Sequence, residues 1–149
     1  MRKDLIVAFL NAAMEIGACD RGMAVDEQMN ILDIVNLNED IRQSPRFNLL
    51  MSVAVRRSIA TNEAIITNNV VTSAAEAPLT NTSFSDLRMV VAIPLEGEGA
   101  IYMDKPVKLG IIPRQMVDNL YEVGQDIIKS EPPVKADKDD IITRYKQRP

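Results

Sequence analysis

The sequence predicts an α+β domain in which helices cover both faces of an antiparallel sheet. Apolar residues recur at helical spacing in three segments, near the beginning, the middle and the end of the chain. Short runs rich in β-branched residues lie between these segments, and tight turns join them, which favours antiparallel pairing over a repeating βαβ arrangement. The length of 149 residues suits one domain with a sizeable hydrophobic core.

The first predicted helix is Arg2–Gly17, because its apolar residues fall on one stripe and a glycine closes it. Two strands follow, Arg21–Val25 and a longer apolar run at Met29–Leu37, with a polar turn between them. The next stretch, Asn38–Gln43, is polar and is predicted to be a loop. The chain therefore begins with a helix and a pair of neighbouring strands.

The middle helix is predicted from its start signal. Ser44 offers a capping hydroxyl and Pro45 suits the first helical position, after which the apolar periodicity continues. Arg56 and Arg57 fall on the outer face of this helix. A solvated surface is the simplest interpretation of these two side chains, and an anion site is the alternative.

A long polar stretch, Asn68–Asp86, follows a short predicted strand at Ala64–Thr67. We expect a loop with one helical turn near residues 72–76, and loops of this length in compact domains usually carry function. Hydroxyl and amide side chains suit a polar small molecule, although local turns in a solvated loop are the alternative. The candidate ligand-binding residues lie in this loop and in the hairpin after it: Asn68, Asn69, Thr72, Ser73, Asn81, Thr82, Ser83, Asp86, Arg88 and Tyr102.

The hairpin is predicted from strands at Arg88–Leu95 and Ala100–Met103, joined by a glycine-bearing turn and followed by a strand end at Asp104. Asp86 and Arg88 flank it, and they either grip a charged ligand group or form a surface ion pair. Tyr102 is either a donor that faces a pocket or an ordinary core tyrosine.

A last helix begins at Pro113 and carries an apolar side. After it, two consecutive prolines and a mixed-charge run predict a mobile tail over residues 131–149. We therefore assign residues 1–130 to the domain. The first and last helices are apolar enough to pair between two subunits, so a homodimer through the terminal helices is expected.

Composition excludes several classes of site. The absence of histidine excludes His-ligated zinc or haem and any Ser-His or Cys-His pair within the chain. Cys19 is the single cysteine, which excludes a disulfide framework and favours a small buried hydrophobe over a reactive thiol. A net charge of −4 opposes nonspecific nucleic-acid binding. No carboxylate pair stands out as acid and base, so we expect neither an enzyme nor a metal site.

The same composition bears on location. The longest apolar run, Leu5–Leu10, is far shorter than the roughly 20 residues that span a bilayer. A lone cysteine without a signal peptide fits a reducing cytoplasm. We expect a cytoplasmic protein that does not contact a membrane.

Three motifs, Ala18–Gly22, Arg88–Leu95 and Gly99–Pro106, occur in this order along the chain, and together they resemble the GAF domain family. Ala18–Gly22 is similar to the family's frequent "gAdRg" start of the first strand. Arg88–Leu95 resembles its "lrSvlavPL" strand, although Met89 stands where many relatives have serine, which bears on pocket volume and polarity. Gly99–Pro106 looks like "GvlyldrP", and the region that resembles the family runs from about residue 5 to 128.

The resemblance implies a PAS-like sensory fold, with a central sheet of five or six strands and a small-molecule pocket over one face. The function implied is a regulatory module that binds a small molecule and relays a signal to a fused or partner effector. A ligand-free dimerisation or interaction module is the alternative. The motifs of the cyclic-nucleotide and bilin members are not matched, and one cysteine does not supply the disulfide cycle of the methionine sulfoxide reductases that share the fold.

Overall fold

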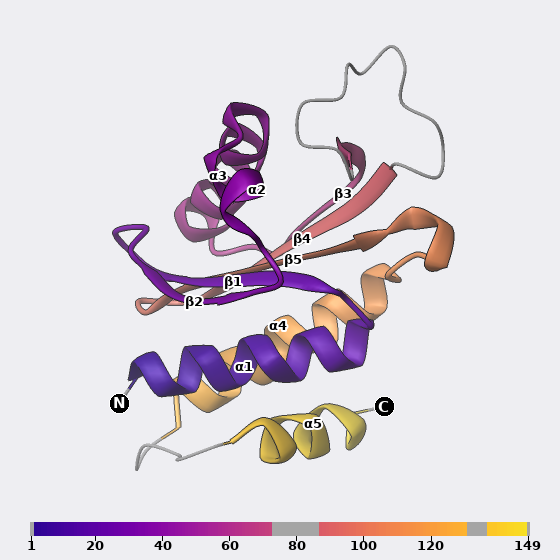
Figure 1. Ribbon diagram of the computed structural model, residues 1–149. Coiled ribbons are helices and arrows are strands. Elements are labelled where there is room, and N and C mark those ends of the chain that lie inside the picture. The colour runs from indigo at the N-terminus through magenta and orange to yellow at the C-terminus, as the bar shows by residue number, and fades with distance from the viewer. Residues whose placement is uncertain (1, 73–86, 131–136, 149) are drawn as a thin grey trace.

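A five-stranded antiparallel sheet forms the centre of the computed structural model, which describes residues 2–72, 87–130 and 137–148 (Figure 1). The strand order is β2-β1-β5-β4-β3, so β5 is the central strand and β2 and β3 are the edges. The strands are β1 (Arg21–Asp26), β2 (Ile31–Val35), β3 (Ile65–Thr72), β4 (Leu87–Leu95) and β5 (Gly99–Pro106). Each neighbouring pair is antiparallel, which confirms the predicted fold class.

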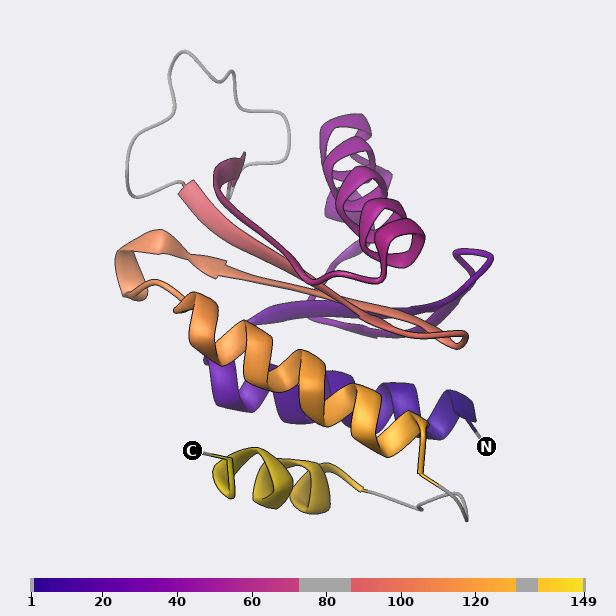
Figure 2. The same cartoon turned by 180° about the vertical axis from the view of Figure 1, so that it is seen from behind.

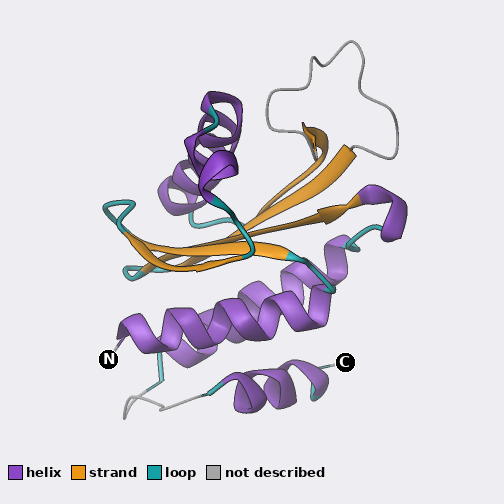
Figure 3. Ribbon diagram, viewed as in Figure 1, coloured by secondary structure: helices purple, strands orange, loops and turns teal. Residues whose placement is uncertain are grey.

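Helices cover both faces of the sheet (Figures 1 and 2). One face carries α2 (Glu39–Gln43) and α3 (Pro45–Thr61), and the other carries α1 (Arg2–Gly17) and α4 (Arg114–Ile128). A short 3-10 turn at Val107–Leu109 leads from β5 towards α4. The secondary-structure view shows α5 (Lys138–Lys146) as a separate layer beyond α1 and α4, away from the sheet (Figure 3).

The alternation of side chains along the strands divides the apolar residues into two cores. On the α3 face of the sheet, Met23, Val90, Ala92 and Tyr102 meet the apolar side of α3. On the opposite, terminal-helix face, the intervening strand residues meet α1 and α4, and α5 adds to this core from outside. Each helical layer is therefore attached to the sheet by its own apolar core.

The predicted start of the middle helix, α3, is confirmed by its cap. The Ser44 hydroxyl accepts a hydrogen bond from the Phe47 backbone N–H at 3.3 Å, and Pro45 occupies the first turn of α3. The polar segment before it differs from the predicted loop, because Asn38 caps a short helix there, α2. Local capping by Asn38 stabilises a helical turn in a stretch whose polarity alone indicated a loop.

The polar stretch after α3 also begins differently from the prediction. β3 continues through Thr72, with Asn68 opposite Met89 and Thr72 opposite Leu87, so the first residues of the expected loop belong to an edge strand. Pairing with β4 outweighs their polar composition, as it can on an edge strand that water reaches. The rest of the expected loop, including residues 73–76 of the expected helical turn, lies outside the described residues.

The expectation of a mobile tail over 131–149 is wrong for residues 138–146, which form α5. Asp137 and Asp140 make a reciprocal capping box at its start. Ile141 is fully buried, and Ile142 is nearly so, in the core formed with α1 and α4. This apolar burial anchors a segment whose charge had indicated a solvated tail.

Candidate functional site

A buried ionic cluster occupies the α3 face of the sheet at the end where β1 begins. The Asp104 carboxylate accepts hydrogen bonds from Arg21 Nε and Nη2, both at 2.8 Å, and from Arg88 Nε at 3.0 Å. Tyr102 donates its hydroxyl to the same carboxylate at 2.6 Å, and Arg88 also pairs with Asp20. We call these five residues the Asp104 cluster.

Strand register explains how the cluster forms. Arg21 of β1 lies directly opposite Asp104 of β5, and Tyr102 lies two residues before Asp104 on the same face. Asp104 is fully buried, and both guanidinium groups are nearly so. Because two arginines face Asp104 and the half-exposed Asp20, the formal charges of the cluster balance. The buried Asp104 carboxylate therefore has its partners within the protein and needs no ligand to pair with it.

An aromatic ring of α3 packs against the Asp104 cluster. The Phe47 ring of α3 meets Tyr102 edge to face, with the ring centroids 5.6 Å apart, and Arg21 Cζ lies 6.0 Å from the Phe47 centroid. Burial, together with the neighbouring Asp104 carboxylate, raises the pKa of Tyr102 well above its usual value. The Tyr102 hydroxyl therefore stays protonated and acts as a donor.

Two side chains connect this end of the sheet to α1 on the opposite face. Lys105 follows Asp104 in β5, is buried, and donates from Nζ to the Gly17 carbonyl at the end of α1, at 3.3 Å. Cys19 lies beside it at the α1–β1 junction, half-buried as a free thiol. Burial, followed by the Asp104 carboxylate, raises the pKa of Cys19 to about 12. The thiol is therefore protonated at neutral pH, in agreement with an unreactive cysteine.

A groove lies on the α3 face between α3 and the edge of the sheet, with a volume of about 100 Å³. We call it the α3 groove. Its lining is mainly apolar and combines four residues of α3 with two of β3 and one of β4: Leu50, Val53, Ala54, Arg57, Ile65, Thr67 and Val90. Thr67 and Val90 lie opposite each other across the β3–β4 pair. The floor of the groove is therefore sheet, and one wall is the side of α3.

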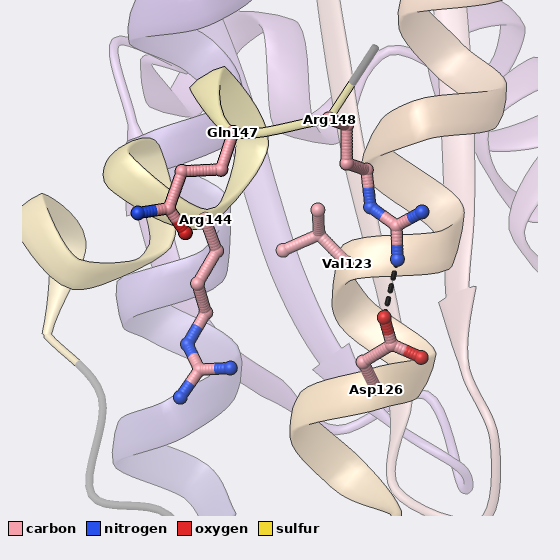
Figure 4. Close-up of a pocket in the computed structure, with 5 residues that line it drawn as sticks. All are labelled: Val123, Asp126, Arg144, Gln147 and Arg148. Atoms are coloured by element: carbon pink, nitrogen blue, oxygen red, sulfur yellow. Dashed lines mark hydrogen bonds and ion pairs between the residues drawn. The ribbon is translucent and has the colours of Figure 1, made fainter.

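A second pocket lies between α4 and α5, with a volume of about 250 Å³ (Figure 4). It is lined by Val123 and Asp126 of α4 and by Arg144, Gln147 and Arg148 from the C-terminal segment. Arg148 already pairs with Asp126, as the figure shows, and with Glu122 at 2.7 Å. Its mixed and partly satisfied charges make it a weaker candidate for a ligand than the α3 groove.

The structure places the ten sequence-predicted candidates in three groups. Arg88 and Tyr102 are brought together, but both bind Asp104 and neither lines the α3 groove. The backbones of Asn68, Asn69 and Thr72 lie in β3. The remaining candidates lie outside the described residues: Ser73, Asn81, Thr82, Ser83 and Asp86.

Two sequence interpretations of charged residues are corrected by this geometry. As chain neighbours, Asp20 and Arg21 are expected from the sequence to neutralise each other at the surface, but Arg21 binds Asp104 and Asp20 pairs with Arg88. The surface ion pair considered for Arg88 is instead a buried one. Tyr102 and Asp104 lie two residues apart, so they share the α3 face if the strand continues through Asp104. The strand does continue, to Pro106, whereas the sequence predicts that it ends at Asp104.

The sequence also does not predict the α3 groove as a site. The sequence predicts a helix around Val53 and Arg57 and a strand at Ile65 and Thr67, but it does not say which strand a helix covers. Only the position of α3 over β3 and β4 brings them together. A helical i, i+3, i+4, i+7 series ending in an arginine is the one local signal.

No family model, curated protein or solved structure matches the chain. In the described ranges, no group of three or more His, Cys, Asp or Glu side chains is placed to hold a metal ion. Those same ranges contain no helix that is both long and apolar enough to cross a membrane. The function is therefore argued from the geometry of the α3 groove and the Asp104 cluster.

Proposed function

We propose that the chain is a GAF-like regulatory module that binds a small molecule in the α3 groove. The observation that carries this proposal is the groove itself, a mainly apolar hollow between a helix and a sheet that has two polar residues in its lining. The three motifs that resemble the GAF family support it by their positions, because they lie at the α1–β1 junction, on β4 and on β5.

A route for the signal follows from the same arrangement. Both described ends of the chain lie in the helical layers on the side of the sheet opposite the groove (Figure 2). Asp104 and Lys105 are consecutive in β5, yet the first joins the cluster on the α3 face and the second binds the end of α1. A shift of β5 on ligand binding would reach the terminal helices through these contacts, and from there a fused or partner effector.

The proposal assigns binding and no catalysis, and a reducing cytoplasm as the location. In the part of the chain that the structure describes, the buried Asp104 carboxylate and its two arginines satisfy one another, which supports a structural role for these ionisable groups. The free and protonated Cys19 thiol suits a compartment in which disulfides do not form.

A thermal-shift screen of nucleotides, amino acids and keto acids tests the proposal. A ligand at 100 times its Kd should raise the melting temperature by about 5–10 °C for a chain of this size. Val53→Trp should remove the shift by filling the groove, whereas Leu49→Trp should retain it, because Leu49 is exposed on the same helix but does not line the groove. No stabiliser in a broad panel, or an equal shift in both variants, would contradict the proposal.

A ligand-free interaction module is the second candidate, and one observation favours it. Leu49 and Val53 lie one helical turn apart on α3, and their exposed fractions are 65% and 56%. Exposed apolar pairs of this kind suit contact with another protein surface. The expected dimer through the terminal helices stays a prediction, although α5 already covers part of α1 and α4. Sedimentation over a wide concentration range tests self-association, and Leu49→Glu should abolish it if α3 mediates the contact.

A further inference from the structure

The α3 groove has a defined chemical character, which indicates the class of its ligand. Leu50, Val53, Ala54, Ile65 and Val90 supply an apolar lining, and the volume is about 100 Å³. An apolar cavity of about 150 Å³ holds a benzene ring, so this groove accommodates a smaller group, roughly four carbon atoms in a branched chain.

Arg57 supplies a positive charge at this hollow. It lies three residues after Ala54 and one turn after Val53, which places it on the same side of α3 as the other lining residues. Within the described ranges, Arg57 has no side-chain partner, whereas its neighbour Arg56 binds the Ser52 hydroxyl at 2.9 Å. No side chain of the described ranges therefore competes with an anion for the Arg57 guanidinium.

Thr67 adds a hydroxyl on the sheet side of the same groove. A guanidinium and a hydroxyl that belong to residues of the same groove lining suit the two oxygens of a carboxylate, since the planar fork of arginine matches carboxylate geometry. A cationic ligand would be repelled, and a neutral one would leave the charge of Arg57 without a counterpart.

We propose that the α3 groove binds a short aliphatic carboxylate, with its branched chain against Val53 and Ile65 and its carboxylate on Arg57. This inference rests on the proposed function, because it names the ligand class for the same groove. The apolar lining selects for chain size, and Arg57 selects for charge. Neither selection uses the Asp104 cluster, whose charges are already balanced.

The test compares three probes of nearly equal shape on the intact chain: isovalerate, the neutral isovaleramide and the cationic isopentylamine. Binding is followed by titration in two-dimensional NMR, which also locates the site through the backbone signals of Arg57 and Thr67. Isovalerate should bind most tightly and shift these signals. Arg57→Gln should weaken isovalerate about 10- to 100-fold and leave isovaleramide unchanged, because a hydrogen bond to a charged group is lost.

Arg56→Gln is the matched control, since Arg56 is the adjacent exposed arginine but does not line the groove. It should bind isovalerate as the natural chain does, and both variants should melt as the natural chain does because the side chains are exposed. The inference is overturned if isovaleramide or isopentylamine binds as tightly as isovalerate, or if the two variants lose equal affinity.

The two levels of proposal fail in different ways. If isovalerate does not bind but another compound of the thermal-shift panel stabilises the chain through Val53, the ligand class is wrong and the regulatory binding function stands. If neither the three probes nor the panel bind, the proposed function fails as well.

Discussion

Removing the charge of Asp104 is the perturbation whose cost the structure defines most clearly. Asp104→Asn preserves the size of the side chain, so it creates no cavity. It leaves the buried guanidinium groups of Arg21 and Arg88 without their shared carboxylate and replaces one acceptor oxygen by a donor amide. Breaking a buried ion pair from one side costs about 3–5 kcal/mol, and here the uncompensated charge is that of Arg21, because Arg88 keeps its ion pair with Asp20.

Urea denaturation measures this cost. With a denaturant slope of about 2 kcal/mol per M, the midpoint should fall by about 1.5–2.5 M. Asp118→Asn is the control, since Asp118 pairs with Arg114 at 3.1 Å on the exposed surface of α4. Exposed i, i+4 ion pairs contribute about 0.3–0.5 kcal/mol to the free energy of unfolding, so Asp118→Asn should cost no more than that.

A loss below about 1 kcal/mol for Asp104→Asn would refute the reasoning, because Asp104 would then behave as an exposed carboxylate does. If the variant does not fold, Tyr102→Phe gives a milder measurement. It removes one hydroxyl donor from the cluster and should cost about 1–3 kcal/mol. A Tyr102→Phe variant as stable as the natural chain would contradict the description of the cluster.

Three further predictions concern the turn, the last helix and the cysteine. Gly99→Ala should destabilise the fold by more than about 3 kcal/mol, since the added Cβ would lie 2.0 Å from a backbone oxygen of β1. Gly97→Ala should cost only about 1 kcal/mol, because no atom lies within 4 Å of the added Cβ. Equal melting temperatures of the two variants would contradict this prediction. Ile141→Ala should lower the free energy of unfolding by about 2 kcal/mol or more in urea denaturation, and Thr143→Ala, at an exposed position, by less than about 0.5 kcal/mol. Equal losses in the two variants would show that the packing of α5 does not contribute to stability. Because the pKa of Cys19 is raised, the folded state keeps the thiol proton between about pH 9 and 12, whereas the unfolded chain loses it. The contribution of Cys19 to the free energy of unfolding should therefore be complete below pH 9 and decline above it. Cys19→Ala should make the free energy of unfolding fall less steeply above pH 9, and an unchanged pH dependence would contradict the raised pKa.

The element order could be predicted because its signals are local. A capping serine followed by proline defines the start of α3, and Asn62 ends that helix in the left-handed conformation that asparagine tolerates. The helix α5 escaped prediction because few of its residues are apolar and charge dominates its sequence. Ile141 is anchored by surface that α1 and α4 provide, and no local pattern describes that surface.

The Asp104 cluster could not be predicted because its members are far apart in sequence. Arg21 and Asp104 are separated by 83 residues, and only the β1–β5 register brings them opposite each other. The α3 groove depends in the same way on which strands α3 covers. Ligand binding by the candidate residues in the polar stretch stays a prediction. The first of these residues lie in β3.

The central position of β5 has a consequence for how the protein unfolds. β5 is hydrogen-bonded to β1 on one side and β4 on the other, and residues 99–105 are buried. Loosening either helical layer exposes this same strand, so the layers should melt in one cooperative transition. Its amide protons should be among the slowest to exchange with deuterated solvent, since they are released only when the whole sheet opens.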